Sequence, residues 1–162
     1  MAELTNLESK LAEVLGLAQA SQKVTEKVAG LVEDESITDR LKQMQDEAAE
    51  TERRCTDYAE TLDGKKTAIL DSARETKGEA TEMMETYLGS DSDELDGFEF
   101  LTMAEAGEVG HWEILGELNQ QAKDQSLQEI VDWAIPIQEH HFATVRDCSL
   151  KLAAAEDALA PA

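Results

Sequence analysis

Residues that break helices are scarce in this sequence of 162 residues, which contains 9 glycines and 2 prolines. Alanine, glutamate and leucine are abundant instead, and these residues, like the lysines, glutamines and methionines of the chain, are good helix formers. Aromatic residues make up only 4% of the chain, so its core must be mostly aliphatic. We therefore predict an all-α fold, and the length suits one domain with a single core.

Positive charge is scarce as well, with 14 lysines and arginines against 36 aspartates and glutamates and a net charge of −22. Because phosphate binding requires clustered cations, we expect no nucleic acid as a partner, and anionic membrane surfaces are disfavoured for the same reason. Three explanations of the acidity stay open: a high-salt cytoplasm, the solubility of exposed helix faces, and a field that attracts cations to a metal site.

Long apolar runs are missing, since no stretch approaches the roughly 20 residues of a membrane span. The first residues lack a basic region followed by an apolar run, so we predict no signal peptide and a cytoplasmic location. The two cysteines, Cys55 and Cys148, lie on different predicted helices. We interpret them as small core residues in a reducing cytosol, with a disulfide still open if the two helices are neighbours.

Apolar residues recur at helical spacing in five segments, which predicts five helices. Their expected ranges are 4–32, 37–62, 65–88, 94–123 and 126–155. The third has the thinnest apolar stripe, and we predict that it crosses over outside a bundle formed by the other four. Ser36 is expected to cap the second helix, and Gly64 to follow its end. Residues 1–158 would form the single domain and residues 159–162 a frayed tail.

Polar side chains interrupt the apolar stripe of the fourth predicted helix. Glu108 and His111 share a helix face with Leu101 and Leu115, and Glu105 lies beside them. An ionised carboxylate that is buried without a partner is strongly destabilising, and a divalent metal ion would compensate for it. Glu108 and His111 also form the Glu-x-x-His pair found in di-iron and di-manganese helix bundles.

Three further residues on other helices are candidate ligands. His141 falls on the apolar stripe of the last helix, with Gln138 one turn before it, and Glu47 and Glu50 lie at the edge of the second helix. Carboxylates and imidazoles on facing helices suit iron or manganese. The sequence therefore predicts a metal site, and its candidate ligands are Glu47, Glu50, Glu105, Glu108, His111 and His141.

Two blocks of residues carry a resemblance to a known family. Residues 47–54, with Glu47, Glu50, Thr51 and two arginines, are similar to a His-x-x-Glu-Thr…Arg pattern, and residues 110–114 are similar to a Glu-His-Tyr-Glu-Ile block. Gln138 and Glu139 fall near a Glu-Glu pair of the last helix. The blocks occur in this order, with a crossover helix between the second and fourth helices. Together they resemble the ferritin-like superfamily, most closely the small stress-related proteins of the YciE/YciF type.

The resemblance implies a ferritin-like four-helix bundle with an additional crossover helix. It further implies iron or manganese, bound as a dinuclear site, and oxidase or peroxide-detoxifying activity. The chain departs from the family pattern, because Glu47 replaces a histidine, Gly110 a glutamate and Gln138 a carboxylate. A mononuclear or asymmetric site is therefore also open, as is the question of whether the protein is an enzyme.

A metal-free helical bundle, acting as an interaction or stress-protective protein, is the alternative. In that case the buried carboxylates and histidines would form a hydrogen-bonded network with Arg53 or Arg54. An arginine facing the carboxylates would favour the network, and an open pocket of carboxylates would favour metal. No Gly-x-Ser-x-Gly, phosphate-binding glycine loop or Cys-x-x-Cys motif favours a hydrolytic or nucleophilic enzyme. The expected partners are metal ions and a second copy of the chain in a homodimer.

Overall fold

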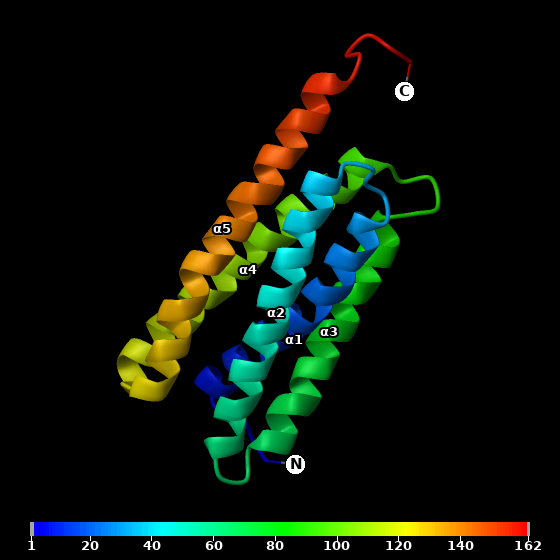
Figure 1. Ribbon diagram of the computed structural model, residues 1–162. Helices are drawn as coiled ribbons and strands as arrows, with labels where there is room; N and C mark the ends of the chain where they lie inside the picture. The colour runs from blue at the N-terminus through cyan, green and yellow to red at the C-terminus, as the bar shows by residue number, and fades with distance from the viewer. Residues whose placement is uncertain (1, 162) are drawn as a thin grey trace.

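The computed structural model describes residues 2–161, which form five helices and no β-strand (Figure 1). The helices are α1 (Asn6–Ala29), α2 (Glu35–Thr61), α3 (Lys66–Tyr87), α4 (Glu94–Ala122) and α5 (Gln125–Ala155). The all-α prediction is confirmed, and each helix lies close to its predicted range.

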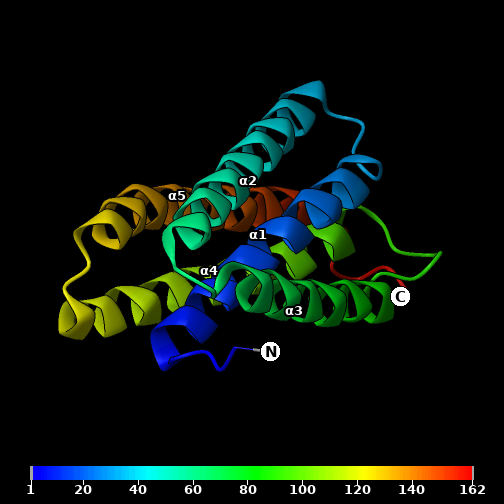
Figure 2. The same cartoon turned by 90° about the horizontal axis from the view of Figure 1, so that it is seen from below.

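Four of the helices form two antiparallel pairs that pack into a bundle. α1 lies along α2 and α4 lies along α5, while α1 contacts α4 and α2 contacts α5 across the bundle (Figure 1). α3 lies on the outer side of α1 (Figure 2) and makes most of its contacts with that helix. Because α3 carries the chain back along the length of the bundle, α2 and α4 run in the same direction.

Short polar side chains cap the N-termini of four helices, among them Asp124 at the start of α5. Thr5 caps α1 and Asp93 caps α4, each in a reciprocal pair with the residue three positions later. Asp34 caps α2, so the expectation that Ser36 does so was wrong. Ser36 lies in the first turn and donates both its backbone N–H and its hydroxyl to the Asp34 carboxylate. An aspartate two residues earlier therefore satisfies the free N–H groups at this helix end.

The apolar core is divided into two clusters along the bundle. One is built around Leu15, Trp112 and Leu127, and the other around Val28, Leu41 and Phe98. In sequence, each helix of the four-helix bundle passes from one cluster to the other through a stretch that contains buried polar residues. The polar residues therefore form a layer between two apolar clusters, and this layer is where a functional site can lie.

Close approach of α3 to α1 depends on a glycine. A Cβ atom at Gly16 would overlap the carbonyl oxygen of Ala73 and would lie 2.7 Å from the Cβ of Thr76. Only a residue without a side chain lets the two backbones come this near. Gly16 therefore sets the position of α3 against the bundle.

Cys55 and Cys148 are both free and both buried. They belong to different apolar clusters, Cys55 to the one with Trp112 and Cys148 to the one with Phe98. The prediction that they are small core residues is confirmed, and they form no disulfide with each other. Over residues 2–161, none of the helices combines the length and the apolar character that crossing a membrane requires.

Candidate functional site

The buried polar layer contains two carboxyl groups, one imidazole and one amide. Glu105 and Glu108 of α4 are 0% and 6% exposed, and Gln138 and His141 of α5 are buried beside them. Ser21 of α1 is also buried at this level. Charged side chains are almost never this deeply buried unless they are paired, so the partners of the two glutamates decide what the layer can do.

His141 lies between two carboxylates from different helices. Its Nε2 is 2.5 Å from Oε2 of Glu47 on α2, and its Nδ1 is 3.6 Å from Oε2 of Glu105 on α4. The same oxygen of Glu105 accepts a hydrogen bond from Nε2 of Gln138. Three helices are therefore joined by one chain of polar contacts.

The two carboxylates change the proton affinity of His141. Burial by itself would lower the pKa of the imidazole, but hydrogen bonds and charge from Glu105 and Glu47 outweigh burial and raise it. Burial would raise the pKa of Glu47, whereas a hydrogen bond from Gln43 and the contact with His141 lower it. Both shifts favour a charged Glu47–His141 pair.

The other oxygen of Glu105 is left without a partner. Oε1 of Glu105 is buried and accepts no hydrogen bond from any group in residues 2–161. Glu108 follows one turn later, and burial together with the charge of Glu105 raises its pKa well above the ordinary value, while the Ser21 hydroxyl opposes the rise. Apart from His141, whose Nδ1 lies 3.6 Å from Oε2 of Glu105, no basic side chain of the described chain forms an ion pair with these two carboxyl groups.

Glu105 and Glu108 are among the residues that line a cavity of about 180 Å³ between α1, α3 and α4. Its walls are mostly apolar, while Ser21, Glu105 and Glu108 supply polar groups. The apolar lining residues are Leu17, Ala20, Val24, Ala80, Met83, Phe100, Leu101, Met103 and Ala104. The sequence does not predict this cavity, and its pattern indicates only ordinary packing for Met83. Small residues on three facing helices were the only available signal.

His111 is not in the buried layer. Its side chain is 38% exposed, and its Nδ1 lies 3.1 Å from Oε2 of Glu13 on α1 and 3.4 Å from Nζ of Lys10. The ring also lines the cavity, on the side of α4 that faces α1. The expectation that His111 faces the core together with Glu108 was wrong, because the ring turns toward charged partners on α1.

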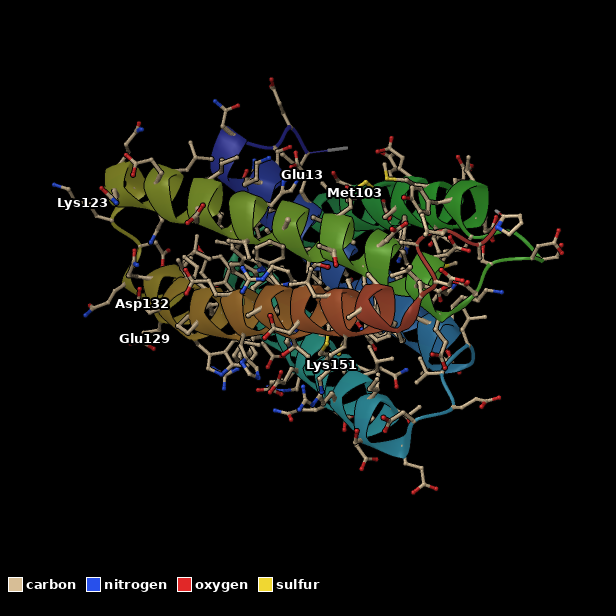
Figure 3. The ribbon with its side chains drawn as sticks, turned by 90° about the horizontal axis from the view of Figure 1, so that it is seen from above. Glu13, Met103, Lys123, Glu129, Asp132 and Lys151 are labelled. Atoms are coloured by element: carbon tan, nitrogen blue, oxygen red, sulfur yellow. The ribbon has the colours of Figure 1, made fainter. Side chains whose placement is uncertain are left out.

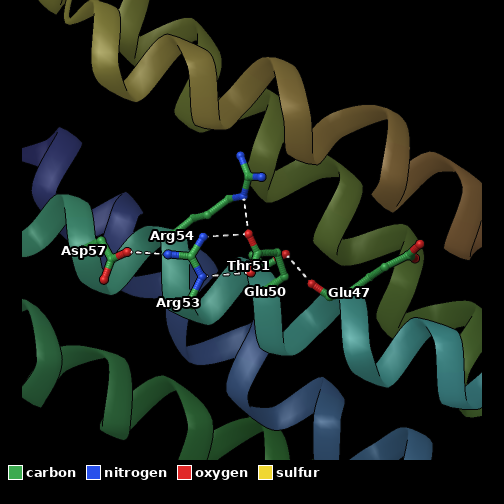
Figure 4. Close-up of polar contacts among 6 residues, drawn as sticks. All are labelled: Glu47, Glu50, Thr51, Arg53, Arg54 and Asp57. Atoms are coloured by element: carbon green, nitrogen blue, oxygen red, sulfur yellow. Dashed lines mark hydrogen bonds and ion pairs between the residues drawn. The ribbon is translucent and has the colours of Figure 1, made fainter.

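The carboxylate of Glu50 forms ion pairs with two arginines of the same helix (Figure 4). It accepts hydrogen bonds from Arg53 and Arg54, which lower its pKa to about 2. Arg54 also lies over the ring of Trp133, 4.1 Å from its centre. The arginines therefore hold Glu50 and do not face Glu105 or Glu108, contrary to the network expected in the metal-free alternative. Glu47 points away from this group, toward α5.

The described residues do not fit a metal ion as they stand. No group of three or more histidine, cysteine, aspartate or glutamate side chains in this part of the chain is arranged to hold one. Glu47 and Glu105 contact opposite nitrogens of the His141 ring, so the three cannot converge on a single ion in this arrangement. Gln138 provides an amide where a bundle metal site would use a carboxylate.

Comparison with known proteins gives no relative from which a role could be transferred. No family model, no curated protein and no solved structure matches the chain. The site must therefore be interpreted from its own geometry.

Proposed function

We propose that this protein binds a cation at the buried carboxyl groups of Glu105 and Glu108. One observation carries the proposal: Oε1 of Glu105 is buried and has no hydrogen-bond partner within the described chain. Leaving a buried acceptor unpaired is destabilising, and more so when it carries charge. A positively charged ligand would pair with this oxygen and would also relieve the repulsion from Glu108.

The electrostatic field of the molecule favours the same ligand. A net charge of −22 raises the local concentration of cations around the molecule, and therefore near the cavity that Glu105 and Glu108 line. Glu13 lies close to His111 but is paired with Lys10, so the attraction comes from the net charge of the whole molecule rather than from Glu13.

Iron(II) or manganese(II) is the inorganic candidate. The support for it is the resemblance to ferritin-like proteins, the order of the helices with α3 as the crossover, and the carboxylate and imidazole groups of α4 and α5. Binding would require Glu105, Glu108 and His141 to converge more closely than they do here. Oxidation of iron(II) by dioxygen or peroxide, which the resemblance implies, stays a prediction of this candidate.

A structural role of the layer is the second candidate. It is favoured by the contacts of Oε2 of Glu105, which is held by Gln138 and lies near His141 without any ligand. In this case the polar contacts would fix the register of α2, α4 and α5, and the protein would act as an interaction or stress-protective bundle. Such a role leaves the unpaired Oε1 of Glu105 unexplained.

Binding of cations to matched variants distinguishes the two candidates. Protein purified without chelator is analysed for bound metal and is then titrated anaerobically with iron(II) or manganese(II), and separately with methylammonium, in a calorimeter. Glu105→Gln and Glu108→Gln should lose saturable binding. Glu99→Gln, which removes the same charge from an exposed position of α4, should retain it.

Two results would contradict the proposal. Binding that is equal in all four proteins would place the cation on the acidic surface. If no cation binds saturably, n-hexylamine included, the proposal is wrong and the structural role of the layer is favoured. High salt in the titration suppresses the surface contribution, because exposed charges are screened within a few ångströms.

A further inference from the structure

The cavity beside Glu105 and Glu108 has walls that suit an organic ligand better than a hydrated ion. Leu17, Val24, Phe100 and Leu101 are among its apolar lining residues. A divalent metal ion such as iron(II) or manganese(II) is usually coordinated by about four to six oxygen or nitrogen donors. The polar side chains that line the cavity are those of Ser21, Glu105, Glu108 and His111, and the His111 ring is turned toward Glu13 and Lys10.

The volume limits the size of the ligand. An apolar cavity of about 150 Å³ accommodates one benzene molecule. A cavity of about 180 Å³ should therefore hold on the order of six to nine non-hydrogen atoms. This is smaller than the usual site for a drug-sized molecule, so the ligand is a fragment-sized amphiphile.

Two flexible side chains lie at the exposed part of the cavity. Met83 of α3 and Met103 of α4 line it and are 57% and 47% exposed. Methionine is unbranched and polarizable, and it adapts to apolar ligands of different shape. Figure 3 shows Met103 on the side of α4 that is turned toward α1 and α3, the same side as Glu13.

We propose that the cavity between α1, α3 and α4 binds a small primary amine with an apolar chain, whose ammonium group pairs with Glu105 and Glu108 and whose chain packs against Leu17, Val24 and Phe100. The ammonium group would donate hydrogen bonds to Oε1 of Glu105, which otherwise has no partner. The apolar chain would lie beside Leu17, which is partly exposed, while the exposed Met83 and Met103 line the outer part of the cavity. The inference rests on the proposed function and names the class of its ligand.

The test uses n-hexylamine, which has seven non-hydrogen atoms and is cationic at neutral pH, with three matched probes. Hexanol has the same chain without the charge, hexanoate has the opposite charge, and methylamine has the charge without the chain. Calorimetric titration of the full chain in high salt should show saturable binding of hexylamine, at least about tenfold tighter than the other three, because a charge-assisted hydrogen bond in a buried site is worth this much.

Two sets of variants test the negative charge of Glu105 separately from the volume of the cavity. Glu105→Gln should weaken hexylamine binding at least about tenfold, while Glu99→Gln leaves it unchanged. Gly107 lines the cavity and has open space around its Cβ position, as does Gly110, which does not line it. Gly107→Leu should block hexylamine and keep every carboxylate, whereas Gly110→Leu, an equal change in the same helix, should leave binding intact.

The failures of the two proposals are distinguishable. If methylammonium or a metal ion binds in a Glu105-dependent manner and hexylamine binds no tighter than methylamine, the organic ligand class is wrong and the cation site stands. If hexanol binds as well as hexylamine and Glu105→Gln has no effect, the cavity is a purely apolar one and this inference is overturned. If no cation binds saturably, both proposals are wrong.

Discussion

Nε2 of His141 lies 2.5 Å from Oε2 of Glu47, which joins α5 to α2 at the middle of the bundle. These two helices share fewer contacts than α4 and α5 or α1 and α2. Glu47 is partly exposed while His141 is almost fully buried, so the pair extends from the polar layer toward solvent. A change in its charge should therefore be transmitted to the packing of α2 against α5.

The first prediction concerns the pH dependence of stability. The pKa of His141 is raised above its ordinary 6.5, so the stabilisation by its protonated ring is complete below 6.5 and is lost as the pH rises through the raised value. The pKa of Glu47 is lowered from its ordinary 4.5, so its contribution is present above 4.5 and is lost as the pH falls through the lowered value. The contribution of the pair should be greatest between these two ordinary values.

Urea unfolding across this range measures the effect, with the free energy of unfolding determined from mildly acidic to alkaline pH. His141→Gln should remove most of the decline that is seen as the pH rises past the raised pKa of His141. His140→Gln, an exposed imidazole one position away, should retain the decline. Identical profiles for the two variants would show that the His141 pair does not control the pH dependence.

The second prediction concerns Glu108. Its pKa is raised well above 4.5, so the protonated carboxyl is tolerated at acid pH and stability is lost as the pH rises from 4.5 toward the raised value. Glu108→Gln should therefore stabilise the ligand-free protein at alkaline pH by on the order of 1–3 kcal/mol. Near or below pH 4.5 it should change stability little.

Chemical unfolding of Glu108→Gln at the two ends of the pH range tests this, in buffers without metal ions or amines. Glu99→Gln serves as the control for the loss of one negative charge from α4. A variant that is equally destabilised at both ends would show that ionisation of Glu108 does not change the stability of the fold, and would contradict a raised pKa.

The third prediction concerns the contact of α3 with α1. Gly16→Ala should destabilise the protein by about 1–3 kcal/mol, because the added methyl group would overlap the Ala73 carbonyl and Thr76. Gly78→Ala, in α3 with open space around it, should stabilise the protein by about 0.5–1 kcal/mol through helix propensity alone. Thermal or urea unfolding of both variants measures the difference, and equal effects would show that α3 is not packed closely at Gly16.

The fourth prediction concerns Glu50. Because Arg53 and Arg54 hold its carboxylate at the surface of α2, Glu50→Gln should leave cation binding unchanged. Its effect on the free energy of unfolding should be less than about 1 kcal/mol, as is usual for partly exposed ion pairs. The same titrations that are used for Glu105→Gln measure this. An equal loss of affinity in Glu50→Gln would show that Glu50 belongs to the binding site.

The helices and their polar interruptions follow from local properties of the chain. Apolar residues at intervals of three and four predict both the helices and their buried faces, and Glu105, Glu108 and His141 are buried as that periodicity predicts. His111 shows the limit of this reasoning. Its position on α4 is near the edge of the buried face, and a partner on α1, Glu13, draws the ring out of the layer.

The sequence by itself determined the all-α class, the ranges of the five helices and the presence of carboxyl groups on an apolar face. These depend on backbone propensity and on periodicity within one helix, which neighbouring residues largely fix. Only the tertiary structure decided which groups of different helices meet: Glu47 with His141, Gln138 with Glu105, and Arg54 with Trp133. It also decided that Glu105 lines a cavity, because the spacing and rotation of packed helices depend on close contacts such as Gly16 with Ala73, which residues far apart in the sequence create together.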